Sequence, residues 1–589
     1  MKFDISKLKG KLAQLRDWMT SKNLPPRLVF IIMGVVSTVW FLVRVIPKPS
    51  RATYPCMQVA APFMSGLIVY LLAVGGLTAL SRKLKHKIIN VRFGATMMLL
   101  TAVIVAMAII PSPVSQTQEE ELLWGSAIEG PNKPFGEAKG IYPGRVVWVW
   151  NPDATNEKFE HNSLDDYEFF WQPDKSNPAV ISKMFQDGIL KLTGEDNLAK
   201  SWDALFKHFN QKKHSDPRSY KKGEMIFIKI NQGQSNWVLR NPVDYANGYK
   251  VGPRDAEGDR RNPRSVTPTE NTPWVVIEIL RELVNEAGIN QEDIYVGDPM
   301  NPIYSHNYDV WVKEFPNVNY IDRGFGDEEA AYWKQFGRTK IEFTEEPYIY
   351  YSDKRSTEKI YDVLVKADYM IYVPVLKAHG AAGISIAAKL NFGNIGASGS
   401  HHLHYSHVAN IREGTPTNTG YGKYRIFVDL MGSKYLGQNS MIYIVEGLFG
   451  GGSRETMGPV KYFMPPFNGD WSNSIFMSLD PVAIESIGYD FLRAEFNGVH
   501  EHDAANNDWE NVANMYGVED YIHQAADPKN WPEGVIYDPD NSGKPIPVLG
   551  IHEHWNNPVD KQYSRNLGTG NGIELVSIPE GLVKSVSSN

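Results

Sequence analysis

Cysteine is almost absent from this chain, because Cys56 is the only one among 589 residues. No disulfide can therefore form within one chain, and the long segment after Cys56 has no thiol to mispair in an oxidising compartment. Cys56 lies in a short loop before the second of three apolar segments. It is either a small residue at a helix entry or a membrane-adjacent thiol that binds a partner or a metal, and we favour the first interpretation.

Basic residues are fewer than acidic ones after residue 111. The first 111 residues hold 15 of the 60 Lys and Arg residues and 2 of the 67 Asp and Glu residues, so residues 112–589 hold 45 basic and 65 acidic residues. This later part therefore carries a net charge near −20, which repels nucleic acid and anionic lipid headgroups. We expect no nucleic-acid partner.

Three apolar segments stand out in the first 111 residues, at 28–47, 60–80 and 93–111. Each has about 20 residues, the length that a helix needs to cross roughly 30 Å of hydrocarbon. Their one charged residue, Arg44, lies near a segment end, where its side chain can reach the headgroups. The alternative is a signal peptide followed by buried helices, but the first segment has no small-residue cleavage site. We expect three transmembrane helices that make the chain an integral membrane protein.

The positions of Lys and Arg predict the orientation of these helices, since basic residues remain in the cytoplasm. Twelve basic residues precede the first segment or lie between the second and third, and only three lie between the first two. The twelve are Lys2, Lys7, Lys9, Lys11, Arg16, Lys22, Arg27, Arg82, Lys83, Lys85, Lys87 and Arg92, and the three are Arg44, Lys48 and Arg51. We expect a cytoplasmic N-terminus and a C-terminal domain outside the cytoplasm, in the periplasm if the cell has an outer membrane.

The remaining sequence predicts a linker followed by one α/β domain. Residues 112–140 are rich in Pro, Gln, Glu and Gly, which indicates an exposed linker. In residues 141–589, apolar segments alternate with amphipathic ones, a pattern typical of a mostly parallel sheet covered by helices. Strands are expected at 145–150, 225–231, 294–297, 369–375, 441–445 and 475–479, and helices at 178–192, 198–209, 272–287, 357–367 and 481–492.

Polar residues follow most of these expected strands. Ligands of open α/β sheets bind beyond the carboxyl ends of the strands, so residues at those ends are natural candidates for a site. They are Asn151, Asp153, Asn231, Asp298, Lys377, His379, Glu446 and Asp480. We expect them to converge, with Asp298, Lys377, His379 and Glu446 as the catalytic candidates.

The densest set of candidates lies in residues 374–394, which read PVLKAHGAAGISIAAKLNFGN. Lys377 and His379 leave a strand together and can present a cation and an imidazole to an anion or a carbonyl group. Glycines let a backbone approach its ligand, and a turn before a helix offers amide donors. The candidate cofactor-binding residues are Gly380, Gly383, Lys389 and Asn391. The segment is neither a Walker loop nor a dinucleotide fingerprint, and the alternative is a solvent-exposed Lys and His at a strand exit.

Histidines gather in the C-terminal third, where ten of the fifteen lie after residue 375. Imidazole and carboxylate together suit Zn, Fe, Ni or Mn, so a divalent transition metal is one candidate cofactor. The candidate metal ligands are His404, His554 and Asp480. No histidine spacing is a zinc signature, and the alternatives are a polar loop at 401–407 and a structural cap at 550–566.

Several of these segments resemble the prokaryotic domain-of-unknown-function family 362. The strongest motif is Lys-x-His-Gly with a later Lys-x-Asn, and the likeness extends to 272–298, 445–447 and 478–483. The motif residues here are Lys377, His379, Gly380, Lys389 and Asn391. The resemblance covers roughly 223–492 and leaves 493–589 as a C-terminal extension. Family members often carry Cys-rich iron–sulfur segments, which this chain lacks, and membership implies no particular activity.

Two functions of different classes fit these residues. The first is an enzyme acting on a small anionic or carbonyl substrate, with Lys377 stabilising charge and His379 as general acid or base. Asp298, Glu446 and Asp480 would then orient those groups or hold a metal. The second is a non-catalytic module that binds a ligand or a membrane partner through the same end of the sheet. They differ in that an acid or base must titrate, whereas a binding residue need only donate or accept.

Overall fold

The structure of the protein is a computed structural model. It describes residues 130–160, 169–233, 268–301, 303–322, 338–395, 403, 405–408, 421–452, 458–496 and 517–584, all within Thr117–Asn589, the second of two units into which the chain divides. The expected membrane segments at 28–47, 60–80 and 93–111 lie outside the described residues, as do residues 112–129 of the linker and His404. Among the residues that are described, no helix combines the length and the apolar character needed to cross a membrane.

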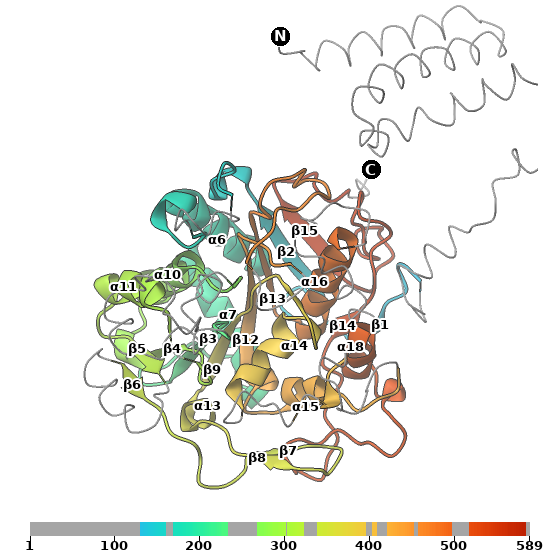
Figure 1. The fold of residues 1–589 in the computed structure, drawn as a ribbon. Coiled ribbons are helices and arrows are strands. Elements are labelled where there is room, and N and C mark those ends of the chain that lie inside the picture. The colour runs from blue at the N-terminus through green and yellow to red at the C-terminus, as the bar shows by residue number, and fades with distance from the viewer. Residues whose placement is uncertain are drawn as a thin grey trace, which may run out of the picture. The chain divides into compact units, whose positions relative to one another are not determined.

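A sheet of nine strands forms the centre of the domain (Figure 1). From one side to the other its strands are β15 (Glu574–Ile578), β2 (Arg145–Trp150), β13 (Ser474–Ser478), β12 (Ser440–Gly447), β9 (Tyr369–Val373), β3 (Ile226–Ile230), β4 (Ile294–Gly297), β5 (Asn319–Asp322) and β6 (Thr339–Lys340). Every pair of neighbours is parallel except the two that involve β13, which is antiparallel to β12 and β2. The expected α/β class with a mostly parallel sheet is confirmed.

The central strands are buried on both faces, which explains their continuous apolar sequences. All residues of β3, β9, β12 and β13 are buried. Successive apolar side chains alternate between two separate hydrophobic clusters, except at Met441 and Ile442 of β12, where the register is irregular. In β2, for example, Val146 and Trp148 belong to one cluster and Val147 and Val149 to the other. β-Branched and aromatic residues fit this doubly packed environment, so the six strands expected from sequence all form.

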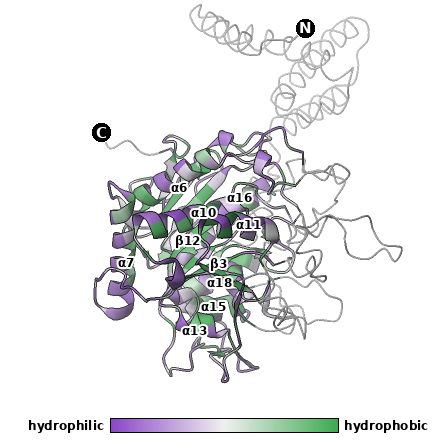
Figure 2. Ribbon diagram, turned by 90° about the vertical axis from the view of Figure 1, so that its left-hand side faces the viewer, coloured by the Kyte–Doolittle hydropathy of each residue, from purple (hydrophilic) through white to green (hydrophobic). Residues whose placement is uncertain are grey.

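Helices cover both faces of the sheet (Figure 1). One face packs on α6 (Pro178–Thr193), α7 (Leu198–His214), α10 (Pro273–Arg281) and α11 (Ser305–Glu314), and the other on α13 (Asp362–Lys366), α14 (Ala387–Leu390), α15 (Ile426–Gly432), α16 (Pro481–Glu495) and α18 (Val518–Ala526). Figure 2 shows hydrophobic strands such as β12 and β3 inside these layers and hydrophilic residues on the outer surface of helices such as α7. The core therefore lies between sheet and helices on both sides.

Local sequence starts two of these helices where expected. Thr272 and Asp480 are the N-caps of α10 and α16, and each accepts hydrogen bonds from backbone amides of the first turn. A proline follows each cap, at a position where its missing N–H is not needed. The expected helix at 272–287 is confirmed, with its last turn wound as a π-helix at Glu282–Glu286.

Other expected elements differ from the structure. The expected helix at 357–367 is only α13, because Thr357–Glu358 forms strand β8 and pairs with β7 (Ile349–Tyr350). The sequence also missed β5, β6 and β15 of the main sheet. β5 and β6 are short and carry polar residues at the margin of the sheet, so their sequences lack the apolar pattern of a doubly buried strand.

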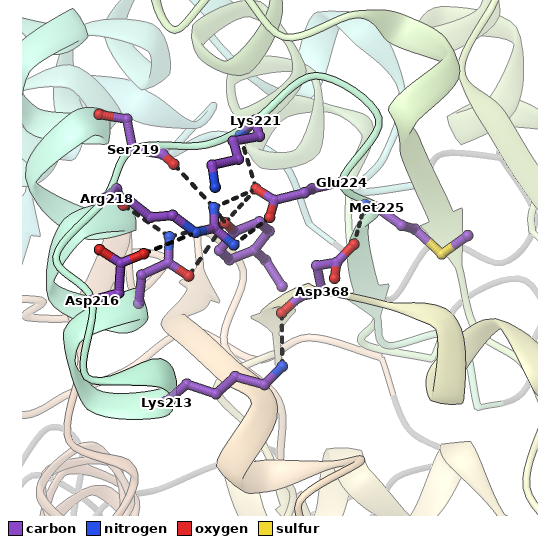
Figure 3. A network of polar contacts seen from close by, with 10 residues as sticks. Lys213, Asp216, Arg218, Ser219, Lys221, Glu224, Met225 and Asp368 are labelled. Carbon is purple, nitrogen blue, oxygen red and sulfur yellow. Dashed lines mark hydrogen bonds and ion pairs between the residues drawn. The ribbon is translucent and has the colours of Figure 1, made fainter.

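Polar contacts fasten the edge of the sheet at which the parallel strands begin (Figure 3). Glu224, just before β3, accepts hydrogen bonds from both terminal nitrogens of Arg218 at 3.0 and 2.5 Å and from the hydroxyl of Tyr369, the first residue of β9, at 2.7 Å. Asp368 accepts from the amide of Met225 at 2.8 Å. These contacts join the chain after α7 to the starts of β3 and β9. These contacts stabilise the fold. The candidate site lies at the opposite edge of the sheet, where the parallel strands end.

Candidate functional site

Strand direction decides which of the expected site residues can meet. β12, β9, β3 and β4 are parallel neighbours, so the residues that follow them lie at one edge of the sheet, which we call the carboxyl edge. The structure places Asp298, Lys377, His379 and Glu446 at this edge, all of them buried. β13 runs in the opposite direction, so Asp480 lies at the other edge, next to the start of β2. The expectation that Asp480 converges with the others is wrong.

Asp480 is a helix cap instead. Its carboxylate accepts hydrogen bonds from the amides of Val482 and Ala483 in α16 at 3.0 and 2.9 Å and from the amide of Lys139 at 2.8 Å. Burial raises the pKa of Asp480 to about 6, and these hydrogen bonds act in the opposite direction. The dipeptide Asp480-Pro481 is typical of the start of a helix. No local feature of the sequence indicates that β13 is antiparallel to its neighbours.

A segment of four residues, 269–272, lies across the carboxyl edge, and we call it the bridging segment. Asn271 Oδ1 accepts a hydrogen bond from the amide of Asn231, after β3, at 2.5 Å. Asn271 Nδ2 donates to Glu446 Oε2, in β12, at 2.9 Å. Because β9 lies between β3 and β12 in the sheet, the bridging segment passes over the end of β9. Sequence reasoning found only the helix start at Thr272 and missed this role of Asn271.

Glu446 is held by three donors of the bridging segment. The amide and hydroxyl of Thr272 donate to Oε1 at 2.9 and 2.6 Å, and Asn271 donates to Oε2. Burial raises the pKa of Glu446 to about 7, while the hydrogen bonds from Thr272 and Asn271 lower it. The main chain of Glu446 also pairs with the exit of β9, because its amide donates to Pro374 O at 2.8 Å and its carbonyl accepts from Leu376 N at 2.9 Å.

Lys377 is held beneath the bridging segment. Its Nζ donates to the carbonyl oxygen of Thr269 at 2.5 Å, and only 3% of the residue is exposed. A carbonyl oxygen fixes the ammonium group without contributing a formal charge. Gly451, which follows β12, lies against both residues: a Cβ at Gly451 would overlap Lys377 Cβ and would lie 3.2 Å from Thr269 Cβ. Glycine is required there because two stretches of backbone approach so closely.

His379 lies in a short hairpin, where β10 (Ala378–His379) pairs with β11 (Gly383–Ile384). Its Nδ1 accepts hydrogen bonds from the amides of Ala381 and Ala382, both at 3.1 Å. A ring nitrogen that accepts hydrogen bonds carries no proton, so this pattern assigns the proton to Nε2. Nε2 is then a hydrogen-bond donor. To act as a general base, His379 would have to accept a proton at Nδ1 and lose both amide contacts. The geometry therefore favours a donor over the acid or base expected from sequence.

A buried ion pair, Lys229 with Asp298, completes the carboxyl edge, and sequence reasoning missed its lysine. Lys229 Nζ lies 3.2 Å from Asp298 Oδ1 and donates to Ile230 O at 2.7 Å. Burial lowers the pKa of Lys229, and Asp298 acts in the opposite direction. Gly393 lies over the pair, since a Cβ there would be 2.8 Å from Nζ and 2.9 Å from Oδ1. The signal was available: a lysine inside the apolar strand Ile-Phe-Ile-Lys-Ile needs a buried partner.

Backbone amides of the glycine-rich turn donate hydrogen bonds to side chains of the protein itself. Those of Ala381 and Ala382 donate to His379, and the amide of Ala388 in α14 donates to Glu485 Oε2, on α16, at 3.1 Å. Burial raises the pKa of Glu485 to about 7. Gly383 has a φ of 78°, the left-handed conformation that the hairpin requires, and Gly380 is buried. For these three amides, the structure gives no support to the expected binding of a carboxylate or phosphate.

Asn391 and Lys389, the other two residues expected to bind a cofactor, contact neighbouring side chains. Asn391 is fully buried, donates to Ala387 O at 3.0 Å and accepts from the hydroxyl of Tyr372 at 2.7 Å. The Lys389 ammonium lies 4.4 Å from the centre of the Phe392 ring. The contact with Tyr372 fastens the short turn after α14 to β9, the contact of Lys389 lies within α14 and this turn, and neither points to a cofactor.

The expected metal ligands do not assemble in the part of the chain that the structure describes. His404 lies outside that part. Asp480 caps the start of α16, whereas His554 Nδ1 contacts Asp490 Oδ1 at 2.7 Å. Asp490 is ten residues further along the helix, which places it about 15 Å from the cap at 1.5 Å per residue. The pairing of Asp480 with His554 on one ion is therefore wrong. No group of three or more His, Cys, Asp or Glu side chains among the described residues could hold a metal ion.

His554 belongs instead to a buried charge cluster of His554, Asp490, Arg493 and Glu519. Besides the contact with Asp490, His554 Nε2 lies 3.4 Å from Glu519 Oε1, and Arg493 approaches the same oxygen at 3.1 Å. Burial alone would lower the pKa of His554, but the two carboxylates raise it to about 9. Burial alone would raise the pKa of Glu519, and His554 and Arg493 bring it down to about 2. A protonated imidazole has no lone pair for a metal.

One known family matches part of the sequence. Residues 266–490 match the model of the domain of unknown function DUF362. This segment is therefore similar to DUF362 domains. It contains the bridging segment, Asp298, Lys377, His379 and Glu446, and it ends at Asp490 within α16. None of the curated proteins and none of the solved structures compared with the chain matches it.

The DUF362 match is narrower than the range of 223–492 expected from sequence. The match begins after β3, so Lys229 and the strands β2, β3 and β15 lie outside it, although all three strands belong to the same sheet. The carboxyl edge thus combines the matched segment with a lysine contributed from outside it. DUF362 carries no assigned activity, so any function must be argued from this edge.

Proposed function

We propose that the carboxyl edge of this α/β domain binds a small anionic or carbonyl substrate and that the protein is an enzyme acting on it. Lys377 would supply the positive charge and His379 Nε2 a hydrogen bond to a substrate oxygen. The observation that carries the proposal is the fixation of Lys377 by the Thr269 carbonyl, two residues before a histidine whose amide contacts leave Nε2 as a donor. Two fixed donors can polarise a carbonyl group or stabilise an oxyanion.

A non-catalytic binding module is the second candidate, and one observation favours it. The carboxylates at the carboxyl edge already bind protein donors: Glu446 accepts three hydrogen bonds, and Asp298 faces Lys229 and accepts from the amides of Gln232 and Met300. Neither is a ready general base in this arrangement. Conversion of a bound ligand, followed by NMR, would favour the enzyme, whereas binding without conversion would favour the module.

Lys377→Met should weaken the binding of small anions about 10- to 100-fold, because it removes a charge-assisted hydrogen bond. The full-length protein, purified in detergent, would be titrated with sulfate, malonate and pyruvate by calorimetry. Lys389→Met is the matched control, since it also removes the charge of a lysine, but one that contacts the Phe392 ring and has no role in the proposed site. Equal affinity of wild type and Lys377→Met, or an equal loss in Lys389→Met, would contradict the proposal.

We further propose that the domain lies outside the cytoplasm, anchored by the three apolar segments at 28–47, 60–80 and 93–111. The support is the split of basic residues around those segments. A periplasmic reporter such as alkaline phosphatase, fused after Asn589, should be active, and the same reporter in the loop at 81–90 should be inactive. The reverse pattern of activities would place the domain in the cytoplasm and end this proposal.

A further inference from the structure

We propose that Asn271 is a positioning residue that, with the Glu446 carboxylate, latches the bridging segment over β9, and that protonation of Glu446 releases this latch and weakens ligand binding at Lys377. The inference rests on the proposed function, because it describes the regulation of the same site. It adds a residue, Asn271, that neither the sequence motifs nor the proposed function assigned.

The latch follows from a closed ring of contacts. The main chain of Glu446 pairs with Pro374 and Leu376, which places Lys377 directly beside it. The Glu446 side chain holds Asn271, and two residues earlier the Thr269 carbonyl holds the Lys377 ammonium. Glu446 therefore fixes both the backbone that carries Lys377 and the acceptor that orients its side chain. Release of the Glu446 side chain would free that acceptor.

Protonation of Glu446 weakens its contact with Asn271. Oε1 accepts two hydrogen bonds from Thr272, and Oε2 accepts one from Asn271, so each oxygen already faces an N–H or O–H donor. A proton on Oε2 would set an O–H against Asn271 Nδ2 and break that contact. A proton on Oε1 can be accepted by the Thr272 hydroxyl, but it leaves Oε2 an uncharged and therefore weaker acceptor for Asn271. The contact with Asn271 is the more easily lost, because it is the single one at its oxygen. Loss of a buried hydrogen bond leaves its partner unsatisfied.

Asn271 also fixes the bridging segment on its other side. Its Oδ1 accepts from the amide of Asn231, and its carbonyl oxygen accepts from Asn307 Nδ2, on α11, at 2.9 Å. The side-chain oxygen of Asn271 thus contacts Asn231, directly after β3, and its side-chain nitrogen contacts Glu446 in β12. An aspartate could keep the contact with Asn231 but could not donate to Glu446, and this difference makes the residue testable.

The surroundings of Glu446 set the pH at which the latch opens. The charged residues on the neighbouring segments are Lys377, at the exit of β9, and Glu270, in the bridging segment. β13 places Ile475 opposite Glu446, and α10 begins with Pro273 and Trp274, none of which titrates. Burial raises the pKa of Glu446 to about 7, so its proton is exchanged near neutral pH. Affinity should therefore fall as the pH falls through this value.

A swap of donor and acceptor provides the test. Asn271→Asp and Glu446→Gln should each weaken sulfate binding about tenfold at pH 8. The first variant places two carboxylates opposite one another, and the second leaves amide donors without an acceptor. The double variant Asn271→Asp/Glu446→Gln restores the hydrogen bond in the opposite direction, from the glutamine amide to the aspartate. It should recover the affinity of the wild type at pH 8. Glu446→Gln alone should bind weakly but independently of pH, since residue 446 no longer titrates and residue 271 remains an amide. Sulfate is a suitable probe because it stays fully ionised from pH 6 to pH 8.

Calorimetric titrations of the full-length protein between pH 6 and pH 8 distinguish the outcomes. The latch is supported if the affinity of the wild type for sulfate falls several-fold toward pH 6 and that of Glu446→Gln does not change with pH. It is overturned if the wild type binds sulfate equally at both pH values, or if the double variant binds no better than either single one.

A measurement without ligand separates this inference from the proposed function. Hydrogen exchange of the amides at 269–272, corrected for the intrinsic effect of pH, should become faster at pH 6 than at pH 8 in the wild type and should not depend on pH in Glu446→Gln. If exchange in the wild type depends on pH in this way but no anion binds, the proposed function is wrong and the latch is still supported. Exchange that is independent of pH in the wild type overturns the latch, whatever binds.

Discussion

Asp298→Asn should lower the free energy of unfolding by about 3–5 kcal/mol, because it leaves the buried Lys229 without its opposite charge. Lys229 has no exposed surface, and Asp298 Oδ1 lies 3.2 Å from its Nζ. An ammonium group in this position must then either lose its proton or disrupt the packing beneath Gly393. Denaturant unfolding of the full-length protein, followed by tryptophan fluorescence, would measure the change.

The matched control removes the cation as well. Lys229→Met keeps the length of the side chain without its charge, so Lys229→Met/Asp298→Asn should be more stable than Asp298→Asn alone. The recovery should be incomplete, because Asp298 also accepts hydrogen bonds from the amides of Gln232 and Met300 at 3.2 and 3.3 Å. If the double variant were less stable than Asp298→Asn, the pair would not be a compensated buried charge and the prediction would fail.

His554→Gln should be similarly destabilising, by about 3–5 kcal/mol at pH 7, because it leaves Asp490 and Glu519 buried with Arg493 as the one remaining cation of the buried charge cluster. Glutamine can donate one hydrogen bond but brings no charge. The thermal unfolding of wild type and variant at pH 7 would test this. Adding Glu519→Gln to the variant restores the charge balance of the cluster and should recover part of the loss; no recovery would contradict the electrostatic explanation.

The same cluster predicts how stability depends on pH. The pKa of His554 is raised from 6.5 to about 9, so its contribution is fully present below about pH 6.5 and is lost as the pH rises through about 9. The pKa of Glu519 is lowered from 4.5 to about 2, so its contribution is present above about pH 4.5 and is lost as the pH falls toward 2. The melting temperature should decline between pH 7 and pH 10 in the wild type and should decline less in His554→Gln. Parallel profiles would exclude His554 as the titrating group.

The candidate site shows how far sequence reasoning reached. It found Asp298, Lys377, His379 and Glu446 because polar residues directly after apolar strands are visible in the sequence, and parallel strands bring such residues to one edge. It failed for Asp480, which obeys the same local rule but follows the one strand that runs the other way. It also missed Asn271, because a partner 175 residues away at Glu446 leaves no local pattern.

Local sequence determined where most strands and helices begin, since caps, prolines and apolar runs act on their own neighbours: Thr272-Pro273 and Asp480-Pro481 start α10 and α16 wherever the chain places them. Only the tertiary structure decided the direction of β13, the ion pair of Lys229 and the tautomer of His379. These depend on contacts with distant parts of the chain. A buried polar group must find a partner, but the sequence does not say which of many distant groups will be within hydrogen-bond distance once the sheet has formed.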